Sequence, residues 1–186
     1  MATAGWITGE YSFGCQPIDY SDNPKAVKLL SGFYWVYLLK MVELIETVFF
    51  ILRKKFNQVT GLHVYHHSST FVLAYISCKF IGGGMSSLPV MLNCFIHILM
   101  YTYYYLSSFG PKWQKALAPW KTKLTIAQMV QFTLMIIHSL TALPSSCGVP
   151  KQFLLIWIPN VILIYKMFYD FYNKSYTAKN NKKKLS

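Results

Sequence analysis

Apolar residues fill five long segments of this chain, and polar or turn-forming residues separate them. The segments cover roughly residues 31–52, 62–81, 88–109, 122–143 and 152–172. Each is about 20 residues long, the length at which a helix crosses the hydrocarbon core of a bilayer. Glycine, proline and serine interrupt the connections, which predicts that the helices end there. We therefore expect an all-α fold, a polytopic membrane helix bundle over 31–172 with about five transmembrane helices.

Composition agrees with a membrane protein and argues against a nucleic-acid binder. Hydrophobic residues make up 54% of the chain, and 18 Lys and Arg face 6 Asp and Glu. The basic residues lie in clusters between the apolar segments, whereas nucleic-acid binding needs a basic stripe on a folded surface. We expect no nucleic-acid partner. Residues 1–30 have no basic stretch before an apolar core, so no signal peptide is expected either.

The clusters of basic residues predict the orientation in the membrane. One side would hold twelve of them: Arg53, Lys54, Lys55, Lys112, Lys115, Lys121, Lys123, Lys174, Lys179, Lys182, Lys183 and Lys184. The other side would hold only Lys25, Lys28 and Lys151. Lys and Arg concentrate in cytoplasmic loops. The N-terminal segment 1–30 is therefore expected to be lumenal, and the polar tail 173–186 cytoplasmic.

Two of the four cysteines fall on the lumenal side of this arrangement. Cys15 precedes the first segment, and Cys147 lies in the fourth connection. Disulfides persist in oxidising compartments, so we expect these two to be bonded to each other. Two unrelated thiols are the alternative. Cys78 and Cys94 lie inside spans and are expected to be packing residues.

The first apolar segment contains ionisable residues that a membrane helix normally avoids. Lys40, Glu43 and Thr47 are spaced i, i+3 and i+7, so they share one helix face. A charged residue at the centre of a span costs about 2.5–3.5 kcal/mol on insertion scales. Lys40 and Glu43 can offset that cost by pairing. The pair either belongs to a site or only fixes which face of the helix looks inward.

Three histidines open the second segment with the sequence HVYHH. His63, His66 and His67 are spaced i, i+3 and i+4, so all three imidazoles point to one side of a helix. A lone histidine in a span is usually a packed core residue. Three on one face predict a functional site.

Further polar residues recur at helical spacing in the third and fourth segments. They are Asn93, His97, Tyr101 and Tyr104 in the third, and Gln128 and Gln131 in the fourth. The aromatic run YTYYYL alone would fit an interfacial belt. With His97 beside it, the run can also line a cavity next to HVYHH. We interpret His138 as a core or lumen-end histidine outside the site.

Two chemistries use a histidine-rich site in a membrane. One is a metal centre, because imidazole binds iron, copper and zinc. Membrane di-iron desaturases and hydroxylases use boxes that resemble HVYHH, but they need several, and this chain has 5 histidines and one box. The other is acyl transfer, because neutral imidazole is a nucleophile and a base near neutral pH. Acyl transfer needs no cofactor. An apolar tunnel between helices would hold a fatty chain, and the basic cytoplasmic residues would meet phosphates at its mouth.

Four motifs, in order, resemble those of the very-long-chain fatty acid elongases, the ELO family. They are KMVELIET at 40–47, QVTGLHVYHH at 58–67, NCFIHILMYTYY at 93–104 and TIAQMVQF at 125–132. The similarity runs from about Trp6 to the end of the chain. The family pattern has Asp where Glu46 stands, an aromatic residue at Gly61 and Ser at Cys94. None of these differences removes a proposed catalytic group.

The resemblance implies a reaction and a role for each polar residue. An acyl-CoA and malonyl-CoA would condense to 3-oxoacyl-CoA, CO2 and CoA, through an acyl group held on His66. His97 would assist from across the site, and His63 and His67 would position groups and manage protons. The substrate pocket would include Lys40, Glu43, Gln58, Asn93, Tyr101, Tyr104, Gln128 and Gln131. The CoA phosphates would meet Lys54, Lys55, Lys121 and Lys123.

The length departs from the family. ELO proteins have seven spans, six of them around an acyl tunnel, and this chain matches five. An incomplete barrel is expected to expose the Lys40/Glu43 face and the histidines to lipid. We therefore expect a fragment, an incomplete gene model or a short form. A non-catalytic membrane partner of full-length copies stays open, as does a metal-dependent lipid oxygenase. A transporter is disfavoured, since no discontinuous helices occur in matched halves.

The tail predicts a location. The terminal sequence Lys183-Lys184-Leu185-Ser186 resembles a di-lysine endoplasmic-reticulum retrieval signal. A solvated basic tail near anionic lipid is the alternative. We expect a multi-pass protein of the endoplasmic reticulum membrane that meets acyl-CoA, malonyl-CoA, other elongation-cycle enzymes and copies of itself.

Overall fold

Five helices form the described part of the chain in the computed structural model, which describes residues 6, 9, 11–56, 59–144 and 147–177. They are α1 (Pro24–Leu52), α2 (Gly61–Phe80), α3 (Ser87–Ser107), α4 (Pro111–Leu140) and α5 (Lys151–Tyr172). A short 3-10 turn, η3 (Gly84–Ser86), precedes α3, and a π-helical turn, η4 (Asn173–Thr177), follows α5. These residues contain no strand, so the all-α prediction is confirmed for this part of the chain.

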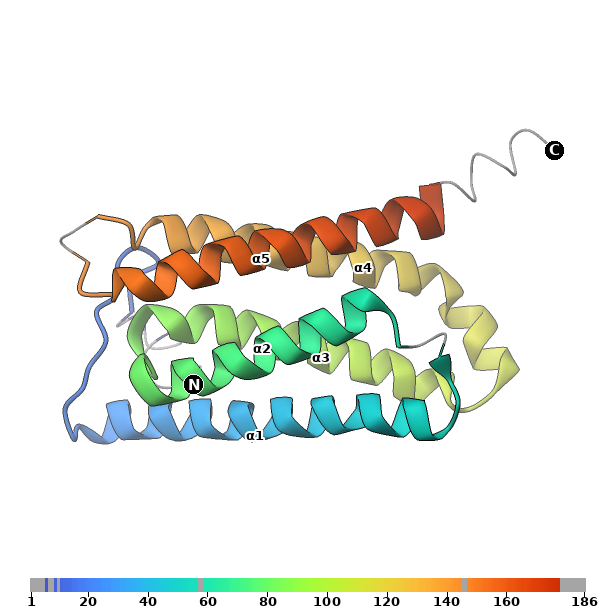
Figure 1. Ribbon diagram of the computed structural model, residues 1–186, viewed down its shortest axis with the longest axis horizontal. Coiled ribbons are helices and arrows are strands. Elements are labelled where there is room, and N and C mark those ends of the chain that lie inside the picture. The colour runs from blue at the N-terminus through green and yellow to red at the C-terminus, as the bar shows by residue number, and fades with distance from the viewer. Residues whose placement is uncertain (1–5, 7–8, 10, 57–58, 145–146, 178–186) are drawn as a thin grey trace.

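The helices run alternately up and down the long axis and close into a ring (Figure 1). Around the ring, α1 packs on α2, α2 on α5, α5 on α4, α4 on α3, and α3 on α1. The expectation that five helices would leave the polar face open is therefore wrong. Lys40 is 5% exposed and Glu43 is 2% exposed, and His66 and His97 are buried as well. The contact between α3 and α1 closes the ring and turns these residues inward.

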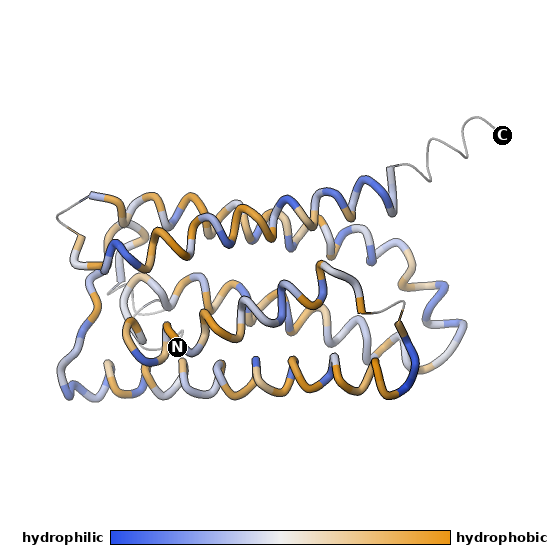
Figure 2. The backbone as a smooth tube through the Cα atoms, in the orientation of Figure 1, coloured by the Kyte–Doolittle hydropathy of each residue, from blue (hydrophilic) through white to orange (hydrophobic). Residues whose placement is uncertain are grey.

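The outer surface of the ring is apolar. Trp35 of α1 is 67% exposed and Leu155 of α5 is 75% exposed, while the buried set includes lysine, glutamate, glutamine and histidine. Figure 2 shows hydrophobic residues along the length of every helix. A water-soluble bundle has the opposite arrangement, with charged residues outside. This distribution fits a bundle surrounded by lipid.

Two stretches in the described residues are long and apolar enough to cross a membrane by length and composition, Gly84–Ser107 and Lys151–Thr177. The other three helices carry more polar residues along their length. α1 contains Lys40, Glu43 and Glu46, and α2 contains the three histidines. Their polar residues on the inner face lower the mean hydropathy of helices whose outer face is apolar.

Two helices begin earlier than the sequence pattern predicts. α1 begins at Pro24 because the Asn23 side chain accepts a hydrogen bond from the Lys25 amide at 3.0 Å, and proline suits the first helical position. α4 begins at Pro111, so the connection expected at 110–121 is helical instead. Pro119 lies inside it, and proline in a helix interior produces a bend. The first turns of α4 are inclined to the rest in Figure 1.

A disulfide between Cys15 and Cys147 ties the N-terminal segment to the α4–α5 connection. Their Cα atoms are 5.6 Å apart. Close by, the Met85 amide donates to the Gln16 carbonyl at 3.0 Å. Gly84 permits this approach, because it has φ of 50° and a Cβ there would collide with the Pro17 carbonyl. We call this end of the ring the disulfide end. The opposite end, at the α1–α2 and α3–α4 connections, is the basic end.

Replacing Cys15 with serine is expected to lower the free energy of unfolding by about 2–4 kcal/mol, since the bond closes a long loop. Thermal unfolding of the detergent-purified chain measures the loss, and maleimide labelling counts the thiols released. Cys78→Ser is the matched control, because Cys78 is a free, half-buried thiol. Equal melting temperatures for the two variants would contradict a stabilising bond.

Candidate active site

A stripe of residues on α1 faces the inside of the ring. Its buried members are Leu29, Phe33, Lys40, Glu43 and Thr47. They are spaced by three, four or seven residues, which keeps them on one helix face. The stripe is apolar toward the disulfide end and polar toward the basic end. The helix thus brings a polar cluster next to an apolar space.

Glu43 is the centre of the polar cluster. Its Oε2 atom accepts a hydrogen bond from Lys40 Nζ at 2.8 Å and lies 3.6 Å from His67 Nδ1. Its Oε1 atom lies 3.1 Å from His97 Nδ1. One carboxylate on α1 therefore faces a lysine of its own helix and histidines of α2 and α3. Such contacts are what allow charged groups to remain buried.

The contacts of His97 define which of its nitrogens carries hydrogen. Lys40 Nζ lies 3.4 Å from His97 Nε2. A lysine ammonium can only donate, so Nε2 is the acceptor in this contact. The hydrogen of a neutral ring is then on Nδ1, the atom that faces Glu43. Lys40 and Glu43 together orient the His97 ring.

The cap of α2 places the histidine face. Thr60 Oγ1 accepts a hydrogen bond from the His63 amide at 3.2 Å, so α2 begins at Gly61, two residues before HVYHH. His63 Nε2 lies 3.0 Å from Thr47 Oγ1 of α1. The rings of His63 and His67 are 4.3 Å apart. The spacing of the motif therefore produces one cluster, as the sequence predicts.

The His66 ring lies edge-on to the His67 ring, with the centroids 5.2 Å apart, but His66 makes none of the polar contacts described above. Its ring packs edge-on against Phe132 of α4 and Phe168 of α5, at centroid distances of 6.5 and 6.0 Å. Within the described residues its ring nitrogens form no hydrogen bond. Of the four candidate catalytic histidines, His66 is the one that lines the central cavity. Its ring is therefore packed against His67 and two phenylalanines, and it lines the cavity.

The central cavity extends from His66 toward the disulfide end. Lys40, Thr70 and Asn93 line it with His66, and the rest of its wall is mostly apolar. Ser77, Pro89, Val90 and Trp157 line both this cavity and a second one next to it. The two adjoining cavities form what we call the channel. Its lining runs from His66 on α2 to Ile81 directly after α2, 15 helical steps or about 22 Å at the rise of an α-helix.

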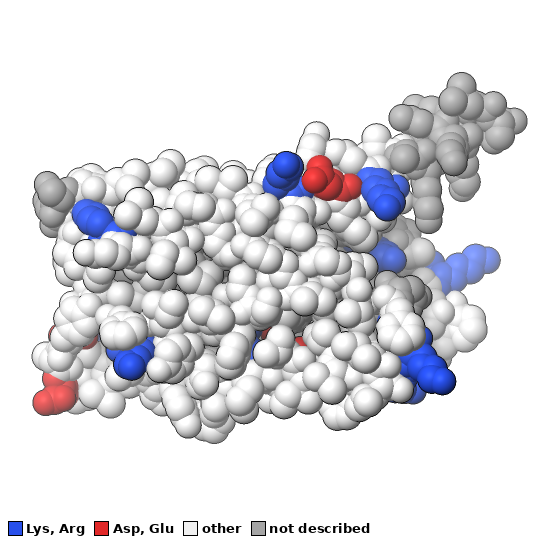
Figure 3. Space-filling view, viewed as in Figure 1, with Lys and Arg blue, Asp and Glu red and all other residues white. Residues whose placement is uncertain are grey.

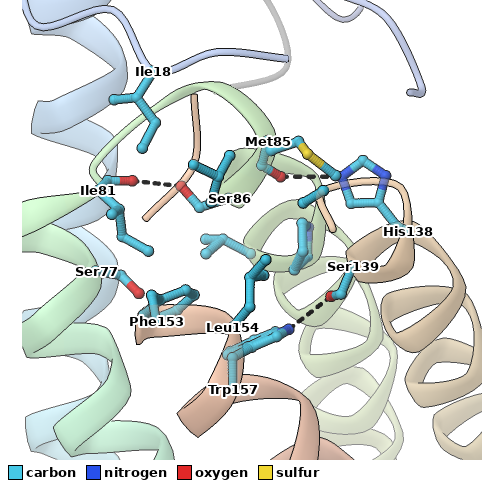
Figure 4. A pocket seen from close by; sticks show the side chains of 14 residues that line it. Ile18, Ser77, Ile81, Met85, Ser86, His138, Ser139, Phe153, Leu154 and Trp157 are labelled. Atoms are coloured by element: carbon cyan, nitrogen blue, oxygen red, sulfur yellow. Dashed lines mark hydrogen bonds between the residues drawn. The ribbon is translucent and has the colours of Figure 1, made fainter. Parts of the chain in front are cut away.

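The second cavity forms the deep end of the channel (Figure 4). Trp157 Nε1 donates to Ser139 Oγ at 2.9 Å, and His138 Nε2 lies 3.1 Å from the Met85 carbonyl oxygen. Ile18 of the N-terminal segment and Met85 lie at this end. His138 is thus a buried residue of the disulfide end. This agrees with the interpretation of His138 from the sequence as a core or lumen-end histidine.

Of the other residues expected in the pocket, some line the central cavity and others do not. Asn93 lines the central cavity. Gln128 and Gln131 point their amides at Met100 and Met135 sulfurs instead, and Tyr101 and Tyr104 are exposed on α3. The Tyr101 ring lies 5.9 Å from that of His97, so it reaches the polar cluster from outside the channel. Gln58 lies outside the described residues.

The lysines expected to meet CoA phosphates are exposed at the basic end. They are Lys54, Lys55, Lys121 and Lys123. Lys123 Nζ lies over the Trp120 ring at 4.6 Å. Figure 3 shows basic side chains gathered at this end, with few acidic ones beside them. Lys183 and Lys184 of the retrieval signal lie outside the described residues.

The sequence interpretation missed two residues of the site, Tyr65 and Asn160. Asn160 of α5 lines the central cavity, and Tyr65 OH donates to its Oδ1 at 2.9 Å. Tyr65 lies inside HVYHH, but an aromatic residue in a membrane helix is normally interpreted as a packing residue. Asn160 is a single polar residue in an apolar segment. Its position in the middle of a predicted span is the one sequence signal that could have marked it as a site residue.

Among the residues that the structure describes, no three His, Cys, Asp or Glu side chains are arranged to hold a metal ion. The histidine rings instead contact a threonine, a lysine, a carboxylate and phenylalanines. The arrangement provides an imidazole without a hydrogen-bond partner in the wall of an apolar channel, with charged groups next to it. It is suited to holding an acyl group and moving protons.

Comparison with known proteins agrees with the motifs. The profile of the ELO: GNS1/SUR4 family matches residues 1–184. A very long chain fatty acid elongase of Aedes aegypti is 41% identical over 179 residues, 96% of this chain and 49% of its own length. Very long chain fatty acid elongase 7 of Drosophila melanogaster is 39% identical over 183 residues, 98% of this chain and 55% of its own length. Very long chain fatty acid elongase 4 of Homo sapiens is 42% identical over 172 residues, 92% of this chain and 54% of its own length. The chain spans about half the length of these relatives.

Lys40→Met is expected to lower the free energy of unfolding by about 3–5 kcal/mol, because it leaves the Glu43 carboxylate buried without its cation. The double variant Lys40→Met/Glu43→Gln removes both charges and is expected to recover most of this loss. Thermal and denaturant unfolding in detergent measure both.

Glu46→Gln is the matched control, since Glu46 is a half-buried carboxylate of the same helix outside this ion pair. A double variant as unstable as Lys40→Met alone would show that the lysine stabilises the bundle by packing rather than by charge.

Proposed function

This chain belongs to the ELO (GNS1/SUR4) family of very-long-chain fatty acid elongases, and we propose that its bundle performs the condensing step of fatty acid elongation. In that step a long-chain acyl-CoA and malonyl-CoA give 3-oxoacyl-CoA, CO2 and CoA. The names of the relatives and the motifs support the reaction class. The five helices of the ring would then all be membrane spans, and 31–172 would be the catalytic bundle.

One observation carries the proposal: of the four candidate catalytic histidines, only His66 lines the central cavity of the apolar channel. A nucleophile for a fatty acyl thioester must lie where the acyl chain can be held. The wall beyond His66 includes Leu73, Phe132, Val161 and Ile164, which offer the chain apolar contacts. His63, His67 and His97 have polar partners and lie outside the channel. This division supports His66 as the acyl carrier and the other three as its assistants.

The chemistry proceeds in two displacements. A ring nitrogen of His66 attacks the thioester carbonyl carbon, the carbon–sulfur bond breaks, and CoA leaves as a thiolate that takes a proton. The acyl group remains on the imidazole. Malonyl-CoA then loses CO2, and the electron pair of that bond forms an enolate. The enolate carbon attacks the acyl carbon, the bond to His66 breaks, the His66 ring takes a proton to become neutral again, and 3-oxoacyl-CoA is released.

The neighbouring cluster supplies charge and proton transfer. Lys40 lines the channel beside His66, so its ammonium can face the malonyl carboxylate or the enolate oxygen. His97 and His67, next to Glu43, can exchange the proton that the thiolate takes. Both roles need these side chains close to the reacting atoms, and their contacts with Glu43 keep them there.

The basic end supports the direction of substrate entry. Lys54, Lys55, Lys121 and Lys123 are exposed there, on the side that the positive-inside rule makes cytoplasmic. Their charges suit the CoA phosphates, and no cofactor is required beyond the two substrates. We place the protein in the endoplasmic reticulum membrane, with the disulfide end lumenal and the tail cytoplasmic.

His66→Ala is expected to abolish formation of the 3-oxoacyl product in membranes that contain this chain. The assay uses labelled malonyl-CoA, a panel of acyl-CoAs and no NADPH, so the cycle stops at the condensation product. Ser68→Ala is the matched control, because Ser68 lies on the exposed side of the same helix. Its turnover should equal that of the wild type.

Full turnover by His66→Ala at normal expression would contradict the assignment. If the folded wild-type chain makes no product, co-purification with a full-length elongase tests the alternative role of a non-catalytic membrane partner. Bound iron in the purified chain would instead support the oxygenase.

A further inference from the structure

Asn160, in the wall of the central cavity, has a hydrogen-bond donor without a partner. It lies on α5 and lines the cavity together with His66 and Lys40. Its Nδ2 atom is buried and has no hydrogen-bond partner in the described residues. A buried donor without a partner destabilises the folded state. Such a group is retained where a ligand completes its hydrogen bond.

Tyr65 fixes the orientation of this amide. Its hydroxyl donates to Asn160 Oδ1 at 2.9 Å, across the contact between α2 and α5. A hydroxyl that donates to the oxygen of the amide leaves the NH2 group as the free end. Tyr65 is the residue before His66, so the helix turn that carries the nucleophile also orients the donor.

The chemistry of the proposed substrate identifies what this donor can bind. The walls near Asn160 are apolar, with Phe132, Val161 and Ile164 among them. A saturated fatty acyl thioester that enters such a space carries one strong acceptor, its carbonyl oxygen. The rest of the acyl chain offers methylene groups, which cannot accept a hydrogen bond.

We propose that Asn160 Nδ2 donates a hydrogen bond to the carbonyl oxygen of the acyl thioester, with Tyr65 as its positioning residue. The proposal rests on the proposed function. When His66 attacks the carbonyl carbon, the π electrons of the carbonyl move to its oxygen, and Nδ2 stabilises that oxyanion. The oxyanion then collapses and expels the CoA thiolate. A donor aimed at a developing oxyanion typically accounts for about 10²–10³ in kcat.

Binding of two unreactive substrate analogues tests this donor directly. One analogue is the ketone in which CH2 replaces the thioester sulfur, which keeps the carbonyl. The other is the alkyl thioether of CoA, which lacks it. The purified full chain is expected to bind the ketone on the order of 2- to 10-fold more tightly than the thioether, as one added hydrogen bond allows. Asn160→Leu is expected to bind both equally.

Two further variants separate the donor from cavity shape. Val161→Leu enlarges a neighbouring side chain of the same wall without changing a donor, so it should change both affinities together and keep their ratio. Tyr65→Phe lets the Asn160 amide rotate and should lower the ratio part of the way. Tyr65→Phe also tests the proposal if Asn160→Leu does not fold.

Measuring turnover is a second test of the role of Asn160. In a chain that condenses acyl-CoA, Asn160→Leu is expected to lower kcat by about 10²–10³ while the affinity for the thioether is unchanged. An unchanged analogue ratio in a folded Asn160→Leu, or full turnover by that variant, would overturn the assignment. A wild-type chain that binds neither analogue and makes no product would overturn both this inference and the proposed function.

Discussion

A buried ion pair between Lys40 and Glu43 determines how the polar interior of this bundle is organised. The two residues come from one helix, yet Glu43 also faces His67 of α2 and His97 of α3. Charged groups inside a lipid-facing bundle must face inward and meet partners. The pair thereby sets the rotation of α1, and the histidines of two other helices are arranged around it. The ring closes over a cluster that lipid could not solvate.

The polar cluster lies next to the apolar channel, so the site combines charged groups with a space suited to a fatty chain. His63, His67 and His97 lie next to polar groups of α1, whereas the His66 ring packs against His67, Phe132 and Phe168. The apolar channel continues from His66 to the disulfide end, while exposed lysines occupy the basic end. A molecule with a charged head and a fatty tail matches both ends. The reacting carbonyl would then lie between them, beside His66.

The sequence predicts the helices and the histidine cluster because both depend on local spacing. HVYHH follows a threonine cap, and its imidazoles meet as helical periodicity requires. Spacing could not show that five helices close into a ring, so Lys40 and Glu43 were expected to face lipid. The helical start of α4 was also missed, because Pro111 and Gly110 resemble a loop. No other polar residue recurs at helical spacing with Asn160, so the sequence pattern did not indicate it. Its proposed role depends on the hydrogen bond with Tyr65 between α2 and α5, which forms only in the folded chain.

Trapping the acyl intermediate would show directly whether His66 carries the acyl group. The purified chain is incubated with a long-chain acyl-CoA in the absence of malonyl-CoA, quenched in acid, and analysed by intact and peptide mass spectrometry. We expect a gain of one acyl group, located on the peptide and residue of His66. An acyl group on another residue, or none while labelled 3-oxoacyl product forms with malonyl-CoA, would contradict a covalent role for His66.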